Sequence, residues 1–212
     1  MPRLRSLLSL PSAYRLFWNA IGGRDYIRIL IGEYVKPQPG NRILDIGCGP
    51  GHVLPYLPEV EYLGFDLSPQ YIATARQRFP QATFVCARVS DYTLPRRSYF
   101  DIALAMGIIH HLDDAEALQL FQIAREALRP GGQLVTLDGA FVPGQSAVAR
   151  YLVRHDRGHF MRSEEGYLQL ARKIFPNVDA FTRQDLLRIP YTHFIMKCAV
   201  PSPARTAAGN SQ

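Results

Sequence analysis

Apolar residues in the first part of the chain recur at the three- and four-residue spacing of amphipathic helices. This pattern covers residues 12–35 and is interrupted at Gly22 and Gly23. Pro37 and the Pro39-Gly40 pair then end it, because neither residue type continues a helix. We therefore expect N-terminal helices within residues 1–36, packed against a core that follows.

From residue 42 onward, short apolar runs alternate with segments of helical spacing. The runs expected to form strands are Arg42–Ile46, Tyr62–Asp66, Thr83–Cys86, Phe100–Met106 and Gln133–Leu137. The helices between them carry start signals, such as Ser68 before Pro69, and Asp113 three residues before Glu116. This alternation predicts right-handed crossovers and a doubly wound, parallel α/β sheet.

Two further strands are expected near the end of the chain. Residues 177–183 and 191–199 are rich in β-branched and aromatic residues and can pair as an antiparallel hairpin at the sheet edge. The prediction is therefore a mostly parallel seven-stranded sheet in one domain over residues 1–200. The Pro-, Ser-, Ala-, Thr- and Gly-rich tail over 201–212 is predicted to be disordered.

Composition favours a single globular domain. The chain has 212 residues, 47% of them hydrophobic, and its apolar runs are shorter than the ~18 residues that cross a bilayer. A signal-like start, with Arg3 and Arg5 before leucines, is stopped by Pro11. The three cysteines lie far apart without metal-ligand spacing. We expect a cytoplasmic protein with reduced thiols.

The chain is basic, with a formal net charge of +6 and a pI near 9.4. Such a balance can attract nucleic acid, anionic lipid or an anionic sugar. The basic residues are dispersed along the chain, however, and a solvated positive surface explains them equally.

A glycine-rich turn follows the first predicted strand. The run DIGCGPG over residues 45–51 places Gly47, Gly49 and Gly51 at alternate positions, where the backbone can turn sharply and let a ligand approach. Glycine spacing alone also suits NAD and FAD. The carboxylate of Asp45 would repel a pyrophosphate at this place by ~1 kcal/mol or more. It suits S-adenosylmethionine, which has no phosphate and carries a sulfonium and an amino group.

A second carboxylate, Asp66, ends the second predicted strand, 15 residues past Gly51. From this position an acid can accept hydrogen bonds from both hydroxyls of a ribose. The alternative is that Asp66 only caps the helix that starts at Ser68.

These motifs together resemble the class I, Rossmann-like S-adenosylmethionine-dependent methyltransferases. The residues that carry the resemblance are 43–51 (ILDIGCGPG), 64–68 (GFDLS), 100–104 (FDIAL) and 128–132 (LRPGG). The resemblance implies that Asp45 and the glycine backbone hold the methionine part of the cofactor, that Asp66 holds its ribose, and that the backbone at Met106 and Gly107 holds its amino-acid end. The candidate cofactor-binding residues are Asp45, Gly47, Gly49, Gly51, Asp66, Leu67, Arg88, Val89, Met106 and His111.

One position departs from the family pattern. Relatives often place an acid after the third strand, where it bonds the adenine amino group, but here Arg88 occupies that position. Adenine recognition is therefore expected from the Val89 backbone, Ser90 or Asp91.

Two histidines follow the fourth predicted strand. Methyl transfer requires mainly that the acceptor be aligned and, if it is a weak nucleophile, deprotonated. His110 and His111 lie at the carboxyl edge of the sheet, where ligands of α/β folds bind. Either histidine can act as the base or only shape the pocket.

The stretch after the fifth strand is dense in polar groups, and we expect residues 139–175 to form a lid over the acceptor. The candidate acceptor-binding residues are Asp138, Tyr151, Arg157, His159 and Arg162. His155 and Asp156 are further catalytic candidates, as a base with an orienting carboxylate. A surface helix with internal salt bridges is the alternative. His155 and His159 have helical ligand spacing, but no acidic cluster accompanies them, and we expect no catalytic metal.

The expected function is direct, in-line methyl transfer from S-adenosylmethionine to a small-molecule or sugar- or lipid-linked acceptor. The sugar- or lipid-linked acceptor is suggested by a resemblance of the C-terminal part to a bacterial methyltransferase subgroup associated with surface polysaccharides. An RNA or DNA methyltransferase is an alternative, although the Asn/Asp-Pro-Pro-Tyr motif is absent after the fourth strand. A non-catalytic S-adenosylmethionine-binding protein and a nicotinamide oxidoreductase remain further alternatives.

Overall fold

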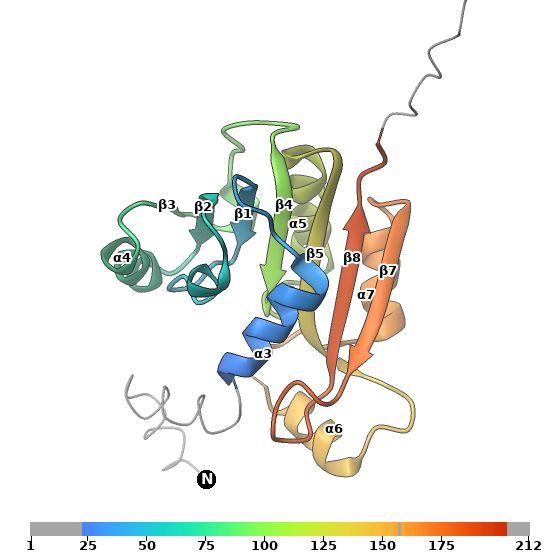
Figure 1. Ribbon diagram of the computed structural model, residues 1–212. Coiled ribbons are helices and arrows are strands. Elements are labelled where there is room, and N and C mark those ends of the chain that lie inside the picture. Colours follow the sequence, from blue (N-terminus) through green and yellow to red (C-terminus); the bar gives the residue numbers. More distant parts are fainter. Residues whose placement is uncertain (1–22, 157, 203–212) are drawn as a thin grey trace, which may run out of the picture.

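A computed structural model of the chain describes residues 23–156 and 158–202 (Figure 1). It begins with α3 (Gly23–Ile29) and the wider helical turn η1 (Leu30–Val35), which ends at Lys36 with a positive φ of 50°. The N-terminal helical pattern before residue 23 and the tail from residue 203 lie outside the described residues, as does Arg157.

The sheet is mixed and mostly parallel, as the sequence predicts. Its strands are β1 (Arg42–Ile46), β2 (Glu61–Asp66), β3 (Thr83–Cys86), β4 (Phe100–Met106), β5 (Leu128–Phe141), β7 (Asn177–Arg183) and β8 (His193–Ala199). They lie in the order β3-β2-β1-β4-β5-β8-β7, and the two-residue β6 (Arg162–Ser163) pairs with the end of β5. The order reverses between β1 and β4, so the carboxyl ends of these two strands flank a switch point where α/β folds bind ligands.

Helices begin where the sequence places caps. In α4 (Pro69–Arg78), α5 (Asp114–Ala127) and α7 (Glu164–Arg172), a side-chain oxygen of the preceding residue accepts a backbone N–H of the first turn. A fourth helix, α6 (Ala147–Arg154), is capped in the same way by Ser146. Single 3₁₀ turns follow β1, β3 and β4, namely η2 (Leu54–Tyr56), η3 (Val89–Asp91) and η4 (Ile109–His111).

The helices cover both faces of the sheet. Helices α5 and α7 lie behind the sheet in Figure 1, and their apolar faces pack on one core that includes Phe121, Tyr167 and Phe175. Helices α3 and η1, together with α4, pack on the opposite core around Leu104 and Ile43. The two cores confirm the doubly wound arrangement.

Several boundaries differ from the sequence prediction. Strand β5 starts at Leu128 instead of Gln133, because residue 128 pairs with Phe100 before the register shifts at a bulge. Strand β8 starts at His193 instead of residue 191. The expected lid over 139–175 is also too long, since residues 139–141 belong to β5 and α7 packs in the core through Tyr167.

The C-terminal hairpin is antiparallel, as predicted. Strand β8 inserts between β5 and β7, and Gly139 of β5 pairs with His193 at one end of the β8 register. The hairpin therefore brings the residues that precede β8 to the carboxyl edge of β5. In the described part of the chain, every helix is too short or too polar to cross a bilayer.

Candidate active site

The glycine loop after β1 has the backbone that the sequence predicts. Gly47, Gly49 and Gly51 have φ values of 74°, 52° and 76°, in the left-handed region that disfavours side chains. At Gly47 a Cβ would also overlap the side chain of Ile108, which follows β4. The loop and the β4–α5 connection therefore lie in close contact, and a ligand can approach the main chain of this loop.

Asp66 holds the glycine loop from the next strand. Its Oδ2 accepts the Gly49 N–H at 3.0 Å, and its Oδ1 accepts the Ser68 N–H at 2.8 Å. Ser68, and not Asp66, provides the side-chain cap of α4. Each carboxylate oxygen retains a further lone pair, so the orientation of Asp66 fits the predicted bonding to a ribose.

The structure corrects the electrostatic argument for Asp45. Its side chain is buried, with the residue only 2% exposed, and its Oδ2 accepts the Tyr62 hydroxyl at 2.5 Å. Burial raises the pKa of Asp45 to about 7, an effect that the Tyr62 hydrogen bond opposes and the Asp66 charge reinforces. Asp45 is therefore not an exposed charge that would repel a pyrophosphate, and its charge does not decide between cofactors.

The proposed adenine region lies beyond Asp66. Leu67, which follows Asp66, is 63% exposed. Val89 is buried in the core and begins η3, while Arg88 is exposed. The Arg88 side chain caps nothing in η3, and the Ser90 hydroxyl donates to Asp91 at 2.9 Å.

The fourth strand ends in a tight turn that presents two histidines. Met106 ends β4, and Gly107, with φ of 70°, donates its N–H to Leu137 at 2.7 Å. The turn η4 follows directly and carries His110 and His111, whose rings lie 4.3 Å apart between centroids. Both histidines are thus at the carboxyl edge, as predicted.

His110 is buried and paired with Asp138 at the end of β5. The Asp138 Oδ1 lies 2.7 Å from His110 Nδ1 and also accepts the His110 backbone N–H at 3.1 Å. Burial lowers the pKa of His110, but the hydrogen bond and charge of Asp138 outweigh it, and the net pKa is raised. The pair anchors the turn η4 to β5.

His111 is exposed and differs from its neighbour electrostatically. Desolvation and the charge of His110 lower its pKa, with a smaller contribution of the same sign from His159. A histidine with a lowered pKa is neutral at pH 7 and can accept a proton.

Arg162, a predicted acceptor contact, instead fixes the histidine turn. Its guanidinium donates to the carbonyl oxygens of Ile109 and Leu112 at 3.1 and 2.9 Å, on either side of the two histidines. It also donates to the Phe160 carbonyl and to Asp114. All five N–H groups of Arg162 are thereby occupied, which leaves none for an acceptor.

The segment between β5 and α7 does not form the predicted His155–Asp156 arrangement. The His155 ring stacks on Tyr151 at 4.0 Å, and its Nδ1 lies 2.8 Å from the Tyr151 carbonyl oxygen. Asp156 accepts the hydroxyl of Tyr191, which precedes β8. Tyr151 is 52% exposed and His159 is also exposed.

Tyr62, Tyr191 and His193 are site residues that the sequence analysis missed. His193 is buried, its Nδ1 has no partner among the described residues, and burial lowers its pKa to about 4. Tyr191 lies against Gly139, where a Cβ would overlap its hydroxyl. No local motif marks these residues, because strand pairing brings them to the site from a distant part of the chain.

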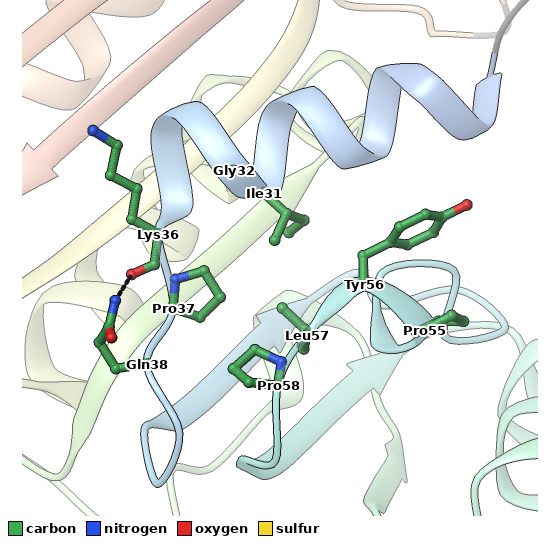
Figure 2. A pocket seen from close by; sticks show the side chains of 9 residues that line it. All are labelled: Ile31, Gly32, Lys36, Pro37, Gln38, Pro55, Tyr56, Leu57 and Pro58. Atoms are coloured by element: carbon green, nitrogen blue, oxygen red, sulfur yellow. Dashed lines mark hydrogen bonds between the residues drawn. The ribbon is translucent and has the colours of Figure 1, made fainter.

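Two pockets differ in their relation to this site. One, of about 590 Å³, lies between η1 and the segment 55–58, near the starts of β1 and β2. Figure 2 shows Ile31 pointing toward Pro37 and Leu57 there. The other, of about 400 Å³, lies between α6 and the residues after it. The described residues contain no cluster of three His, Cys, Asp or Glu side chains suited to a metal ion.

Comparisons with known proteins agree with this geometry. A family model described as a methyltransferase domain matches residues 43–132. An uncharacterized methyltransferase of Synechocystis sp. is 28% identical over 126 residues, which are 58% of this chain and 59% of that protein. The demethylmenaquinone methyltransferase of Chlorobaculum tepidum is 25% identical over 179 residues, 79% of this chain and 70% of that protein.

A solved structure shares the fold. It is a phosphoethanolamine N-methyltransferase of Haemonchus contortus, in complex with phosphomonomethylethanolamine and S-adenosylhomocysteine. The TM-score is 0.64 at 19% identity, covering 83% of this chain and 52% of that one. The chain thus spans little more than half of two of these three proteins. Over residues 43–132 the chain thus resembles a methyltransferase domain, and it shares its fold with a methyltransferase solved with S-adenosylhomocysteine.

Proposed function

We propose that this chain methylates a small-molecule acceptor beside η4, with His111 as the group that takes the acceptor's proton. The observation that carries the proposal is the turn itself. It is held by Asp138 through His110, and by Arg162 through the carbonyls of Ile109 and Leu112. His111 is the exposed residue within this braced segment.

The residues around the glycine loop fit the cofactor. Asp66 would bond the ribose hydroxyls, the main chain of the loop at Gly47 and Gly49 would lie against the methionine part, and Leu67 would cover the adenine. When bound, S-adenosylmethionine supplies a methyl group on a sulfonium that is already a good leaving group. The contact between Gly47 and Ile108 links this loop to the histidine turn.

The chain's own contribution is then alignment and proton removal. His111 lies at the carboxyl edge of the sheet, three residues after Ile108, which contacts the glycine loop, and its lowered pKa keeps the imidazole neutral at pH 7. The acceptor's hydroxyl or amine would give its proton to this imidazole as it takes the methyl group. His110, with a raised pKa and a buried carboxylate partner, serves as a positioning residue.

Two relatives support a small-molecule acceptor. The Chlorobaculum tepidum protein is a demethylmenaquinone methyltransferase, and the Haemonchus contortus enzyme is solved with phosphomonomethylethanolamine. The dispersed basic residues of this chain do not by themselves require nucleic acid. A small molecule is therefore the acceptor class we propose.

The test follows labelled methyl groups. The full chain is incubated with methyl-labelled S-adenosylmethionine and a fractionated native extract, and the molecules that gain label are identified. With that acceptor, His111→Gln should lower kcat by about 10²- to 10⁴-fold and remove the acidic limb of the pH profile, without changing cofactor affinity. His155→Gln, at an exposed histidine outside the turn, is the control.

Label confined to RNA or DNA would overturn the small-molecule acceptor. Tight cofactor binding without label in any fraction would favour a non-catalytic binding protein. An unchanged kcat in His111→Gln would show that His111 is not the base.

A further inference from the structure

Helix α6 presents two arginines on one face. Arg150 and Arg154 are four residues apart, so their side chains lie one above the other, and both are exposed. Two like charges at this spacing destabilise a helix. A nearby negative charge would relieve this repulsion.

Neither arginine finds such a charge within the described part of the chain. No hydrogen bond or ion pair joins the Arg150 or Arg154 guanidinium to another described residue. Other arginines near sheet edges are paired: Arg42 binds Asp101 at 3.1 Å, and Arg183 binds both Asp185 and Glu33 at 2.7 Å. The two guanidiniums of α6 are thus available to a ligand.

These arginines line a pocket of about 400 Å³, a size typical of small-molecule sites. Its lining residues are Phe141, Arg150, Arg154, Gly158, His159 and Met161. The lining contains three basic side chains and no acidic one, while Phe141 and Met161 provide apolar surface. This combination fits a molecule with an anionic group and an apolar or neutral remainder.

The pocket adjoins the histidine turn. Gly158 packs against His110 so closely that a Cβ would overlap the imidazole. Two residues later, Phe160 donates its N–H to the His110 carbonyl. His159 is close enough to His111 to lower its pKa. A ligand in the pocket would therefore lie near the proposed base.

We propose that the pocket between α6 and residues 158–161 binds the anionic group, phosphoryl or carboxylate, of the methyl acceptor through Arg150 and Arg154. The inference rests on the proposed function, since it places the acceptor's remaining atoms beside His111. A planar guanidinium donates two parallel N–H groups to either anion, and His159 adds a third donor side chain.

The test measures anion binding without cofactor or acceptor, so it is independent of methyl transfer. Inorganic phosphate and citrate are titrated separately into the full chain at low ionic strength, with heat as the signal. We expect at least one of them to bind, and Arg150→Gln with Arg154→Gln to weaken this binding by about tenfold or more. The matched control, Arg172→Gln with Lys173→Gln, removes the same charge from exposed residues at the end of α7 and should retain the affinity.

The two probes separate phosphoryl from carboxylate recognition. Failure of both anions to bind, or an equal loss in the control variant, would overturn the pocket. Salt-dependent binding of an RNA oligonucleotide that the α6 variant abolishes, with no binding of either small anion, would assign the arginines to nucleic acid instead. Identification of a methyl acceptor that has neither a phosphoryl nor a carboxylate group would also contradict the inference.

Discussion

Neighbouring residues of the same type in this site differ in pKa and hydrogen bonding according to their burial. Asp45 lies within β1 and Asp66 ends β2, yet Asp45 is buried against Tyr62 while Asp66 accepts the backbone N–H groups of Gly49 and Ser68. The pair His110 and His111 shows the same contrast, with the pKa of one raised and that of the other lowered. Burial and hydrogen bonding therefore assign different roles to neighbouring residues of the same type.

The burial of Asp45 predicts a specific pH dependence of stability. Its folded pKa of about 7 lies above the unfolded value of about 3.9, so the native state holds an extra proton between these pH values, and stability falls as pH rises through this window. Asp45→Asn should remove this loss. In urea denaturation without ligand, the free energy of unfolding of the variant relative to the wild type should rise by on the order of 3 kcal/mol between pH 4 and pH 8.

Asp101 is the control for this measurement, because folding lowers its pKa, whereas folding raises the pKa of Asp45. Burial tends to raise the pKa of Asp101, but its hydrogen bonds to Arg42 and Arg129 outweigh burial and hold the pKa well below its usual range. Asp101→Asn should therefore be destabilised by a constant amount across pH 5 to 8. A stability difference between Asp45→Asn and wild type that does not change with pH would show that Asp45 is ionised when folded.

At the scale of elements, one arginine links the C-terminal hairpin to the N-terminal helical turn. Arg183 of β7 donates to Glu33 and to the Tyr34 hydroxyl of η1, at 2.7 and 2.9 Å, and also to Asp185. The Tyr34 ring packs edge-on against Phe181 of the same strand. Residues about 150 positions apart in the chain are thus joined across the sheet face.

Arg183→Gln should loosen this junction. We expect a loss of about 1–2 kcal/mol in the free energy of unfolding, because several charge-assisted hydrogen bonds disappear while the side chain remains polar. Chemical denaturation measures it. The control is Arg97→Gln, which removes an exposed ion pair with Glu126 and should cost less than about 1 kcal/mol. Equal losses in the two variants would show that Arg183 contributes no more to stability than an exposed ion pair.

At the scale of the whole molecule, the sheet combines two halves with different tasks. Strands β1 to β4 carry the glycine loop and Asp66, and β5 with the hairpin brings Asp138 and Tyr191 to the other side of the histidine turn. Helix α6 lies beyond the sheet edge where β4 ends (Figure 1). A cofactor bound to the first half would therefore stabilise the native chain as a ligand of the folded state alone.

Ligand-dependent melting tests this cofactor assignment. S-Adenosylhomocysteine at 100 times its Kd should stabilise the chain by about 2.7 kcal/mol, seen as a rise in Tm, whereas NADH should not change Tm. Asp66→Ala should weaken the binding of S-adenosylhomocysteine by about 1–3 kcal/mol, because two charged hydrogen bonds are lost. Stabilisation by NADH instead would contradict the cofactor assignment, and full affinity for S-adenosylhomocysteine in Asp66→Ala would contradict the ribose role of Asp66.

The local pattern of the chain determined the strands, the caps and the glycine loop. Alternating apolar runs, Ser68 and Asp113 as caps, and the loop glycines act through contacts within a few residues, so sequence alone predicts them. It could not separate the lid from the core, because Tyr167 is placed by long-range packing.

Only the tertiary structure decided which polar groups meet. Asp45 contacts Tyr62, Asp138 contacts His110, and Asp156 contacts Tyr191, and no spacing in the sequence records these contacts. Arg162 is the sharpest case, since its residue type suits an anionic acceptor but its five N–H groups are all used within the fold. Burial and pairing depend on the folded neighbourhood, and they set the charge that each group carries.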